Sequence, residues 1–535
     1  VDRSIGLYND MAVLVFGRHS AEGSDKSMNT GEAEDEKAPD GSSYGWTHKQ
    51  LAKDAEGNIY KHQLQLTDRE EALIEFVKDQ GFGRIVVVLN TSATIEIGNL
   101  EDDPAIDGIA WIGGPGAMGY KTLAKIISGE VNPSGKTTDL WQRDFTLDPT
   151  WQNFGNNRQT GSTHAITING KNISGAYTEG DNNWRDGNFG LYKMDYEEGL
   201  YFGYKLYETA YNDLQVAKGG TLSDQYDKTQ YDYDYQVIYP FGYGLSYTTF
   251  SYSNMKVYTD ASLSEELTGS VNPTKFAIDG DNRSATKKLY VTVDVENNGE
   301  RAGKEAVQIY VTAPYRADDS DPTVDKPFVS LVGFAKTDEI APKDTETVVV
   351  EVNVQDIASY DYSNANKNNF KGYELDSGEY VIRAMGNSHA YADPDSTVVG
   401  YDEARFTLSG DAYLKYDDYA DREVGNKFST ENGVFDSMRT EGFTVTNNDP
   451  MTLLTRSTLT TAYPVAPKYD AETKLYPGND ITDEMGKTVQ FYDAYSLDNQ
   501  FYGTNFETFS KDGWTVDTIY TETNVDDIDD PSMPW

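Results

Sequence analysis

The chain has 535 residues, of which 38% are hydrophobic and 13% aromatic, which is enough for globular domains with real cores. Its formal net charge of −43 repels nucleic acids and anionic membranes and suits a neutral ligand such as a sugar, although acidity can equally serve solubility alone. The absence of cysteine excludes disulfides and a cysteine nucleophile, and five histidines without an HExxH motif predict no metal site.

The first part of the chain alternates predicted strands with predicted helices. Apolar runs typical of strands buried on both faces lie at residues 11–16 (MAVLVF), 84–89 (RIVVVL) and 106–112 (IDGIAWI). A helix is expected to begin after Thr67, which can cap it, and to stop at Gly81. Further helices are expected at 118–128 and 196–212, with a long surface loop at 150–192. This alternation predicts a mostly parallel sheet covered by helices.

The hydrophobic pattern changes to a period of two after about residue 285. Alternating runs lie at residues 289–295, 305–311, 329–336, 346–354 and 378–385. Short alternating strands joined by turns predict an antiparallel β-sandwich. We therefore divide the chain into an α/β domain at 1–250, a linker at 251–284, the β-sandwich at 285–410 and an irregular, extended connector at 411–535.

Gly114 to Gly119 (GPGAMG) matches the pattern G-x-G-x-x-G, after a predicted strand and before a predicted helix, and Asp139 lies about twenty residues further on. This pattern is typical of a dinucleotide site, in which the glycines let the backbone approach a pyrophosphate. The dinucleotide pattern normally follows the first strand of its unit, however, and two predicted strands precede this one. A tight, glycine-rich turn is the favoured interpretation.

Glu22 lies in the run SAEGSD (residues 20–25), just beyond the first predicted strand, where open α/β sheets bind ligands. Because the chain has 88 acidic residues, an exposed loop acid is the ordinary interpretation of this spacing alone. A third motif, at residues 239–248 (YPFGYGLSYT), is rich in aromatic residues and glycine. It could stack on a sugar ring, but packing at the domain junction is favoured.

Taken in order, these stretches resemble glycoside hydrolase family 3. Residues 84–144, which include the GGPGAMG loop and the NPSGK run, resemble its α/β sandwich domain. Residues 197–209 (EEGLYFGYKLYET) and 239–249 resemble two further motifs of the family, and residues 289–311 and 328–385 resemble the fibronectin type III-like domain that follows. The resemblance implies an α/β sandwich domain with a mostly parallel sheet, an antiparallel fibronectin type III-like β-sandwich and an irregular C-terminal connector.

The resemblance also implies chemistry. The acid/base glutamate of this family lies in a loop of the pattern [SG]-x-E-G-x-D, which Glu22 matches, so we expect Glu22 to be the catalytic acid/base. The glycine pattern then belongs to a loop of the sandwich domain, so no cofactor is expected. The implied activity is that of a retaining, exo-acting, β-glucosidase-like glycosidase on β-linked oligosaccharides or glycosides, and the sequence does not fix the sugar.

The family's nucleophile is an aspartate of a (β/α)8 barrel near an SDW motif, which this sequence lacks. Residues 451–464 and 529–535 resemble a connector into a C-terminal barrel, as in members with the reversed domain order. We therefore expect the barrel in a separate chain, cleaved off, or beyond this sequence, and we expect activity only in its presence. The alternatives are a non-catalytic carbohydrate-binding or structural protein and, less favoured, a nucleotide-dependent oxidoreductase. Composition suits an extracellular or cell-surface location, and a cytoplasmic one stays open.

Overall fold

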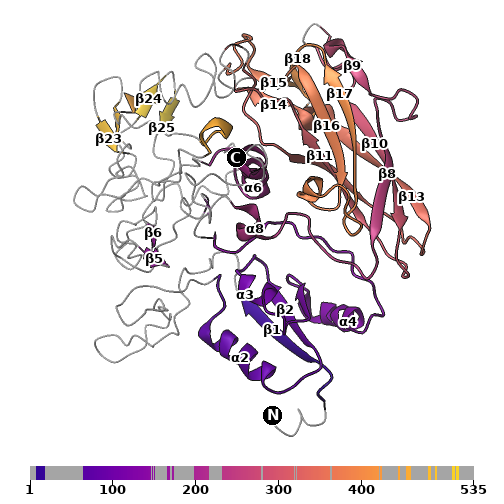
Figure 1. Ribbon diagram of the computed structural model, residues 1–535. Helices are drawn as coiled ribbons and strands as arrows, with labels where there is room; N and C mark the ends of the chain where they lie inside the picture. Colours follow the sequence, from indigo (N-terminus) through magenta and orange to yellow (C-terminus); the bar gives the residue numbers. More distant parts are fainter. Residues whose placement is uncertain are drawn as a thin grey trace, which may run out of the picture.

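The computed structural model describes residues 8–18, 64–150, 198–215, 232–424 and 454–459, apart from 146, 147, 149, 279, 280, 318, 319, 321, 362, 363 and 421. Outside these ranges it describes the backbone of a few short strands. Two folded bodies, an α/β body and a β-sandwich, lie side by side with α6 and α8 at their junction (Figure 1).

The α/β body is built on a parallel three-stranded sheet in the order β1-β2-β3. The strands are β1 (Ala12–Arg18), β2 (Ile85–Thr91) and β3 (Gly108–Trp111), and the helices are α2 (Asp68–Lys78), α3 (Gly98–Glu101) and α4 (Gly116–Ile127). Thr67 and Glu70 close a capping box at the start of α2, and Gly81 follows its end with a φ of 74°. The predicted start and stop of this helix are therefore confirmed.

β1 differs from its prediction because only one of its faces is buried. Ala12, Leu14 and Phe16 join the core beneath α2, whereas Val13 and Val15 are 43% and 54% exposed. β1 is an edge strand of the described sheet, so the apolar run does not mark a strand covered on both faces.

The junction elements are short. They are the pair β4 (Trp141–Gln142) with β7 (Val237–Tyr239), the helices α6 (Tyr204–Ala210) and α8 (Tyr233–Gln236), and the π turn η2 (Tyr211–Gln215). The helix predicted over 196–212 begins only at Tyr204, because Gly203 adopts a φ of 54° that ends the preceding turn. Within the predicted loop 150–192, the backbone forms the hairpin β5 (Ile166–Ile168) and β6 (Lys171–Ile173).

The second body is a sandwich of two sheets, in the orders β13-β10-β8 and β12-β11-β16-β17-β9, and its pairs are antiparallel except β9 with β17. The strands are β8 (Phe250–Tyr258), β9 (Gly269–Val271), β10 (Lys288–Asn297), β11 (Ala306–Thr312), β12 (Ser330–Lys336), β13 (Thr345–Asn353), β16 (Gly378–Met385) and β17 (Tyr401–Leu408). A third sheet joins β14 (Ser359–Asp361), β15 (Gly372–Leu375) and β18 (Ala412–Leu414). Valines and isoleucines from both main sheets fill one core, as the alternating pattern predicted.

The range 251–284, predicted as a linker, already belongs to the sandwich. β8 pairs with β10 as an edge strand, and β9 pairs with β17 in the other sheet. Alternation in β8 is interrupted by a bulge, where Asn254 has a φ of 56°, and this break hides the strand pattern in the sequence.

The remaining short elements lie on loops and in the C-terminal region. They are the 3-10 turns η4 (Pro273–Lys275), η5 (Val354–Ile357), η6 (Ala390–Ala392) and η7 (Arg456–Thr458), and the strands β19 (Tyr416–Asp417), β20 (Arg422–Glu423), β21 (Thr444–Val445), β22 (Asp480–Thr482), β23 (Thr488–Gln490), β24 (Phe509–Lys511) and β25 (Trp514–Val516). In the part of the chain that the structure describes, no helix has the length and apolar character needed to cross a bilayer.

Candidate active site

The carboxyl ends of the three parallel strands meet at one edge of the first sheet. The register sets Arg18 of β1 against Thr91 of β2, and Leu89 of β2 against Trp111 of β3. The indole of Trp111 donates a hydrogen bond of 2.7 Å to the Thr91 carbonyl, which joins the ends of β2 and β3. Loops leaving such an edge are where α/β sheets hold their ligands, so the candidate active site begins directly after Arg18.

Glu22 and the rest of the run at 20–25 lie in the segment 19–63, outside the described residues, so the catalytic role of Glu22 stays a prediction. The structure describes the residues on either side of this segment. They show how its two ends are held.

Arg18 joins the two ends of the segment that contains Glu22. Its guanidinium contacts both carboxylate oxygens of Glu70, at 2.6 and 2.7 Å, and donates to the Gln65 carbonyl at 2.8 Å. The side chains of Arg18 and Glu70 are only 8% and 17% exposed. Because Arg18 precedes the segment and Gln65 follows it, this contact holds the described residues at its two ends together. Sequence patterns miss such a pair, since 52 residues separate its members.

The ion pair is charged in the folded protein. Burial alone would raise the pKa of Glu70, but the hydrogen bonds from Arg18 and from the Thr67 backbone outweigh burial and bring the pKa below its ordinary value. The carboxylate thus has two tasks, since it caps α2 and pairs with the last residue of β1.

A second contact extends from the base of the loop into the body of the domain. The side-chain amide of Gln65 donates to Glu96 at 2.7 Å, and the other Glu96 oxygen accepts from the backbone N–H of Phe145 at 2.7 Å. Glu96 is 7% exposed, so this buried carboxylate is satisfied on both oxygens. The loop base is therefore tied to the chain that follows β4.

The glycine-rich run forms the turn from β3 into α4, as the favoured interpretation predicted. Gly113 and Gly116 have φ values of 57° and 62°, a region that residues with a Cβ rarely adopt. A Cβ on Gly119 would lie 2.6 Å from the Cβ of Pro115. The turn itself therefore requires these glycines. Asp139 lies beside β4, where its carboxylate accepts from the Leu140 N–H at 2.9 Å and burial raises its pKa.

The aromatic motif at 239–248 packs at the domain junction, as favoured above. Phe241 stacks on Tyr204 with ring centres 4.6 Å apart, and Tyr239 stacks on Tyr243 at 4.6 Å. The side-chain amide of Gln308, on β11, donates to the Gly242 carbonyl at 3.0 Å. These contacts join the motif to the β-sandwich.

The NPSGK run (132–136) meets the same motif from the other side. Asn132 accepts hydrogen bonds from Ser246 and from the Tyr247 N–H, and it donates to the Ala302 carbonyl at 3.0 Å. Lys136 lies 3.1 Å from Glu305 in a largely buried ion pair. Two of the motifs that carry the family resemblance are thus structural and fasten the α/β body to the sandwich.

Glu208 of α6 is a buried junction carboxylate that sequence patterns did not single out. It is fully buried and accepts hydrogen bonds of 2.8 Å from the hydroxyls of Tyr233, Ser388 and Tyr391. It also lies 2.7 Å from His389 Nδ1, and the His389 ring stacks on Tyr233. With four partners and no exposure, Glu208 holds α6 against the sandwich and is not a catalytic candidate.

Over the described ranges, no group of three or more histidine, cysteine, aspartate or glutamate side chains is arranged to hold a metal ion. The described part of the candidate site has three features. They are the carboxyl edge of the parallel sheet, the contacts of Arg18 with Glu70 and Gln65, and the glycine-rich turn from β3 into α4.

The structure thus consists of an α/β domain joined to a β-sandwich, and both domains match known family models. Residues 6–204 match the glycosyl hydrolase family 3 C-terminal domain, and residues 305–388 match the fibronectin type III-like domain. These matches show that the chain contains a glycosyl hydrolase family 3 C-terminal domain followed by a fibronectin type III-like domain.

Its curated relatives are longer proteins. The chain is 28% identical over 319 residues to a beta-glucosidase of Ruminococcus albus, which covers 60% of this chain and 24% of the relative. It is 28% identical over 379 residues to beta-glucosidase A of Butyrivibrio fibrisolvens, which covers 70% of this chain and 35% of the relative. Beta-glucosidase 3B of Thermotoga neapolitana, solved with glucose, is 25% identical with a TM-score of 0.46, over 76% of this chain and 39% of that structure.

Proposed function

We propose that this chain is the part of a retaining, exo-acting β-glycosidase that supplies the general acid/base, Glu22, while an aspartate nucleophile comes from a (β/α)8 barrel outside these 535 residues. The observation that carries the proposal is the family match over residues 6–204, which includes the Glu22 loop. Relatives named beta-glucosidases support a β-linked glucoside as the substrate. The clamp between Arg18 and Glu70 supports a loop base fixed at the carboxyl edge of the sheet.

Retention needs two carboxyl groups about 5 to 5.5 Å apart, one to donate a proton and one to attack the anomeric carbon. In the first step Glu22 protonates the glycosidic oxygen as the bond to the anomeric carbon breaks and the barrel aspartate forms its ester to the sugar. In the second step Glu22, now a carboxylate, takes a proton from the water that attacks the anomeric carbon and releases the aspartate.

The division of the two carboxylates between parts of the protein has a physical consequence for Glu22. A carboxylic acid donates efficiently near neutral pH only if its pKa is raised, and burial in a closed cleft raises it. Closure over Glu22 by the barrel would supply that burial. The isolated chain is therefore expected to have no glycosidase activity.

The first test uses the purified 535-residue chain with nitrophenyl β-glucoside. No turnover is expected. Turnover that Glu22→Gln abolishes would refute the proposal that the nucleophile lies elsewhere. A chain that stays inactive even when a barrel is supplied would favour a non-catalytic, carbohydrate-binding role.

The second test uses the protein together with its barrel. Glu22→Gln should lower kcat/KM about 10²- to 10⁴-fold for glucosides with poor leaving groups, because general acid catalysis contributes about that much. The loss should be much smaller for dinitrophenyl glucoside, whose leaving group departs without a proton, and added azide should restore turnover by attacking the glycosyl-enzyme directly. Glu32→Gln, in the same segment, is the matched control. Equal losses on both substrates without azide rescue would show that Glu22 is not the acid/base.

A further inference from the structure

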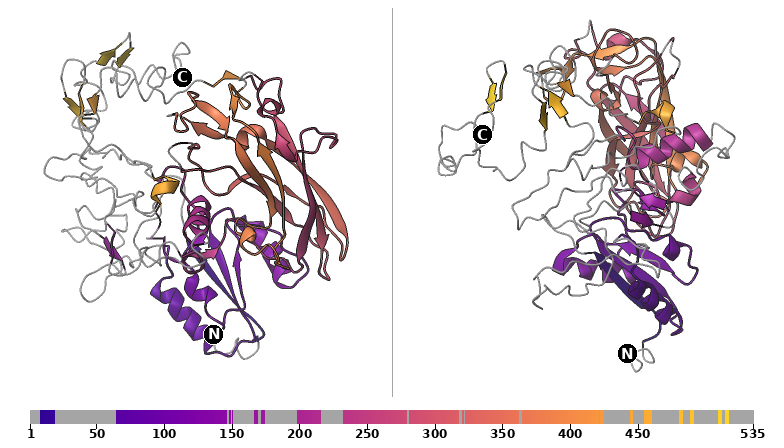
Figure 2. Two further views of the ribbon diagram at one scale, coloured as in Figure 1. Left: turned by 45° about the horizontal axis from the view of Figure 1, so that its top comes forward. Right: turned by 90° about the vertical axis from the view of Figure 1, so that its left-hand side faces the viewer.

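Residues 454–459, from the C-terminal region, pack into the junction between the two bodies. The 3-10 turn η7 lies beside α6 in both ribbon figures (Figures 1 and 2). Leu454 and Leu459, on either side of the turn, are only 3% and 1% exposed. They join an apolar cluster with Tyr201 and Tyr207, so this short stretch buries two large side chains in a core that is otherwise remote in sequence.

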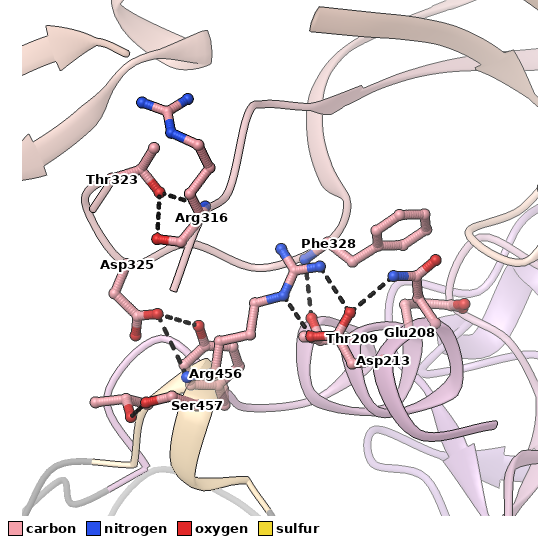
Figure 3. Close-up of polar contacts among 12 residues, drawn as sticks. Glu208, Thr209, Asp213, Arg316, Thr323, Asp325, Phe328, Arg456 and Ser457 are labelled. Carbon is pink, nitrogen blue, oxygen red and sulfur yellow. Dashed lines mark hydrogen bonds and ion pairs between the residues drawn. The ribbon is translucent and has the colours of Figure 1, made fainter. Parts of the chain in front are cut away.

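Arg456, between these two leucines, has charged and aromatic partners (Figure 3). Its Nε and Nη2 contact the two oxygens of Asp213 at 2.5 and 2.7 Å, a bidentate pair. Its guanidinium lies 4.3 Å from the ring centre of Tyr315, and its backbone N–H donates to Asp325 at 3.3 Å. Only 7% of the side chain is exposed.

The charges at this contact are consistent with a stable ion pair. Burial alone would lower the pKa of Arg456, but the hydrogen bond and charge of Asp213 raise it above its ordinary value. Burial raises the pKa of Asp325, which accepts from the Tyr201 hydroxyl at 3.0 Å as well as from the Arg456 N–H. Arg456 is thus charged and bonded to separate parts of the chain through Nε, Nη2 and its backbone N–H, whereas its buried Nη1 has no hydrogen-bond partner.

The partners of Arg456 come from the junction and from the sandwich. Asp213 lies on the π turn that continues α6, whereas Asp325 and Tyr315 lie on the loop between β11 and β12 of the sandwich. α6 is attached to the same loop and to β12, because Thr209 accepts from the Phe328 N–H and Tyr204 accepts from the Leu331 N–H, both at 2.9 Å. The segment therefore binds where the two bodies meet rather than on either alone.

The cluster that holds the leucines also reaches the sheet of the first body. Leu140 and Val237, on or next to the β4–β7 pair, contact the same cluster, whereas Trp141 and Tyr239 of that pair pack into the core beneath β1 and β2. The β4–β7 pair thus lies between the bound segment and the sheet whose edge starts the Glu22 loop.

We propose that residues 454–459 are a docking anchor, which fixes this part of the C-terminal region on the junction and so sets the face from which the chain after Leu459 departs. The anchor rests on the proposed function only where it concerns a barrel. If a barrel follows this region, the anchor positions it against the sheet edge from which the Glu22 loop starts. Arg456 is the positioning residue, since it contacts the junction turn η2 through its charge and the sandwich loop through its backbone.

The test of docking is amide hydrogen exchange on the full 535-residue chain. Arg456→Gln should speed exchange of residues 454–459 at least about tenfold, while the strands of the sandwich keep wild-type protection. Arg422→Gln, an exposed arginine just after the sandwich, is the matched control and should change nothing at 454–459. Exchange within about twofold of wild type in Arg456→Gln would overturn the anchor.

If Arg456→Gln loses protection from amide exchange throughout the chain, the milder variant Arg456→Lys is measured next. Lysine keeps the charge but cannot form the bidentate pair. Local release in Arg456→Lys, with the sandwich still protected, supports the anchor. Release throughout the chain in both variants would overturn it, because the residue would then support the whole fold and not a separate docking contact.

The activity arm uses the protein together with its barrel. Arg456→Lys should lower kcat/KM about tenfold while dinitrophenyl and nitrophenyl glucosides are affected alike, since the defect lies in placing the barrel and not in proton transfer. An unchanged kcat/KM in a variant whose anchor is released would overturn the positioning role. Because exchange is measured without substrate, the anchor and the glycosidase proposal can fail separately.

Discussion

Glu208→Gln removes a charge from the centre of the domain junction with almost no change in volume. In the native protein one carboxylate oxygen accepts from Tyr233 and Ser388, and the other contacts His389 and accepts from Tyr391. Glutamine offers a single acceptor oxygen, so two of the four partners lose theirs. A hydrogen bond to a charged group contributes about 1.5 to 3 kcal/mol, and rotation of the hydroxyls recovers part of the loss. We expect the free energy of unfolding to fall by about 3 kcal/mol.

Differential scanning calorimetry of the full chain measures this loss. At about 2 to 4 °C per kcal/mol for domains of this size, the midpoint should drop by about 6 to 12 °C. Glu300→Gln, at a side chain that is 89% exposed, is the control and should stay within about 0.5 kcal/mol of wild type. A midpoint for Glu208→Gln within about 2 °C of the control would refute the view that this carboxylate holds α6 to the sandwich.

Gly242→Ala should lower the thermal unfolding midpoint more than Gly113→Ala. Both glycines have a positive φ, which costs about 1 to 2 kcal/mol when a Cβ is present. Of the two, only Gly242 would place its Cβ against a side-chain atom, 1.9 Å from Gln308 Oε1. Equal midpoints would contradict the close packing. Burial raises the pKa of Glu374 from its ordinary value of 4.5 to about 7. Between these two pH values the folded protein keeps a proton on Glu374 that the unfolded chain has released. Its contribution to stability is therefore present in acid and lost as the pH rises through about 7, and wild type should lose about 1.4 kcal/mol relative to Glu374→Gln for each pH unit crossed in between. A pH-independent difference in urea unfolding would count against this. Arg18→Gln should lower the unfolding free energy by about 3 to 5 kcal/mol, because it leaves Glu70 buried without its partner, and adding Glu70→Gln should cost less than the sum of the two single changes; additive losses would show that the pair does not interact.

Sequence patterns predicted those helices and strands that are specified by residues close together in the chain. Thr67 and Glu70 of the capping box are three positions apart, and the alternation of β10 is visible along the strand, so helix α2 and the start of the sandwich could be found from the sequence. β1 could not be read fully, because apolar composition does not say whether a strand lies inside a sheet or at its edge. β8 was hidden by a bulge at Asn254 that shifts its alternation.

The candidate site was predicted only in part, because the contacts around it join residues that are far apart in the sequence. The Glu22 loop was found through family resemblance, and its structure is not described, so the catalytic assignment stays a prediction. The contacts that fix the site and the junction join residues far apart in the chain: Arg18 and Glu70 are 52 positions apart, Glu208 and His389 are 181 apart, and Asp213 and Arg456 are 243 apart. No local pattern encodes such pairs, because each is created only when distant parts of the chain fold together.

The single amide nitrogen of Gln308 on β11 donates to the Gly242 carbonyl of the junction motif at 3.0 Å and to the Gly386 carbonyl of its own sandwich at 2.9 Å. A bending motion between the two bodies would have to give up the buried bond to Gly242, and a buried polar group left without its partner costs about 1 to 3 kcal/mol. The α/β body and the sandwich should therefore tumble as one rigid block in solution.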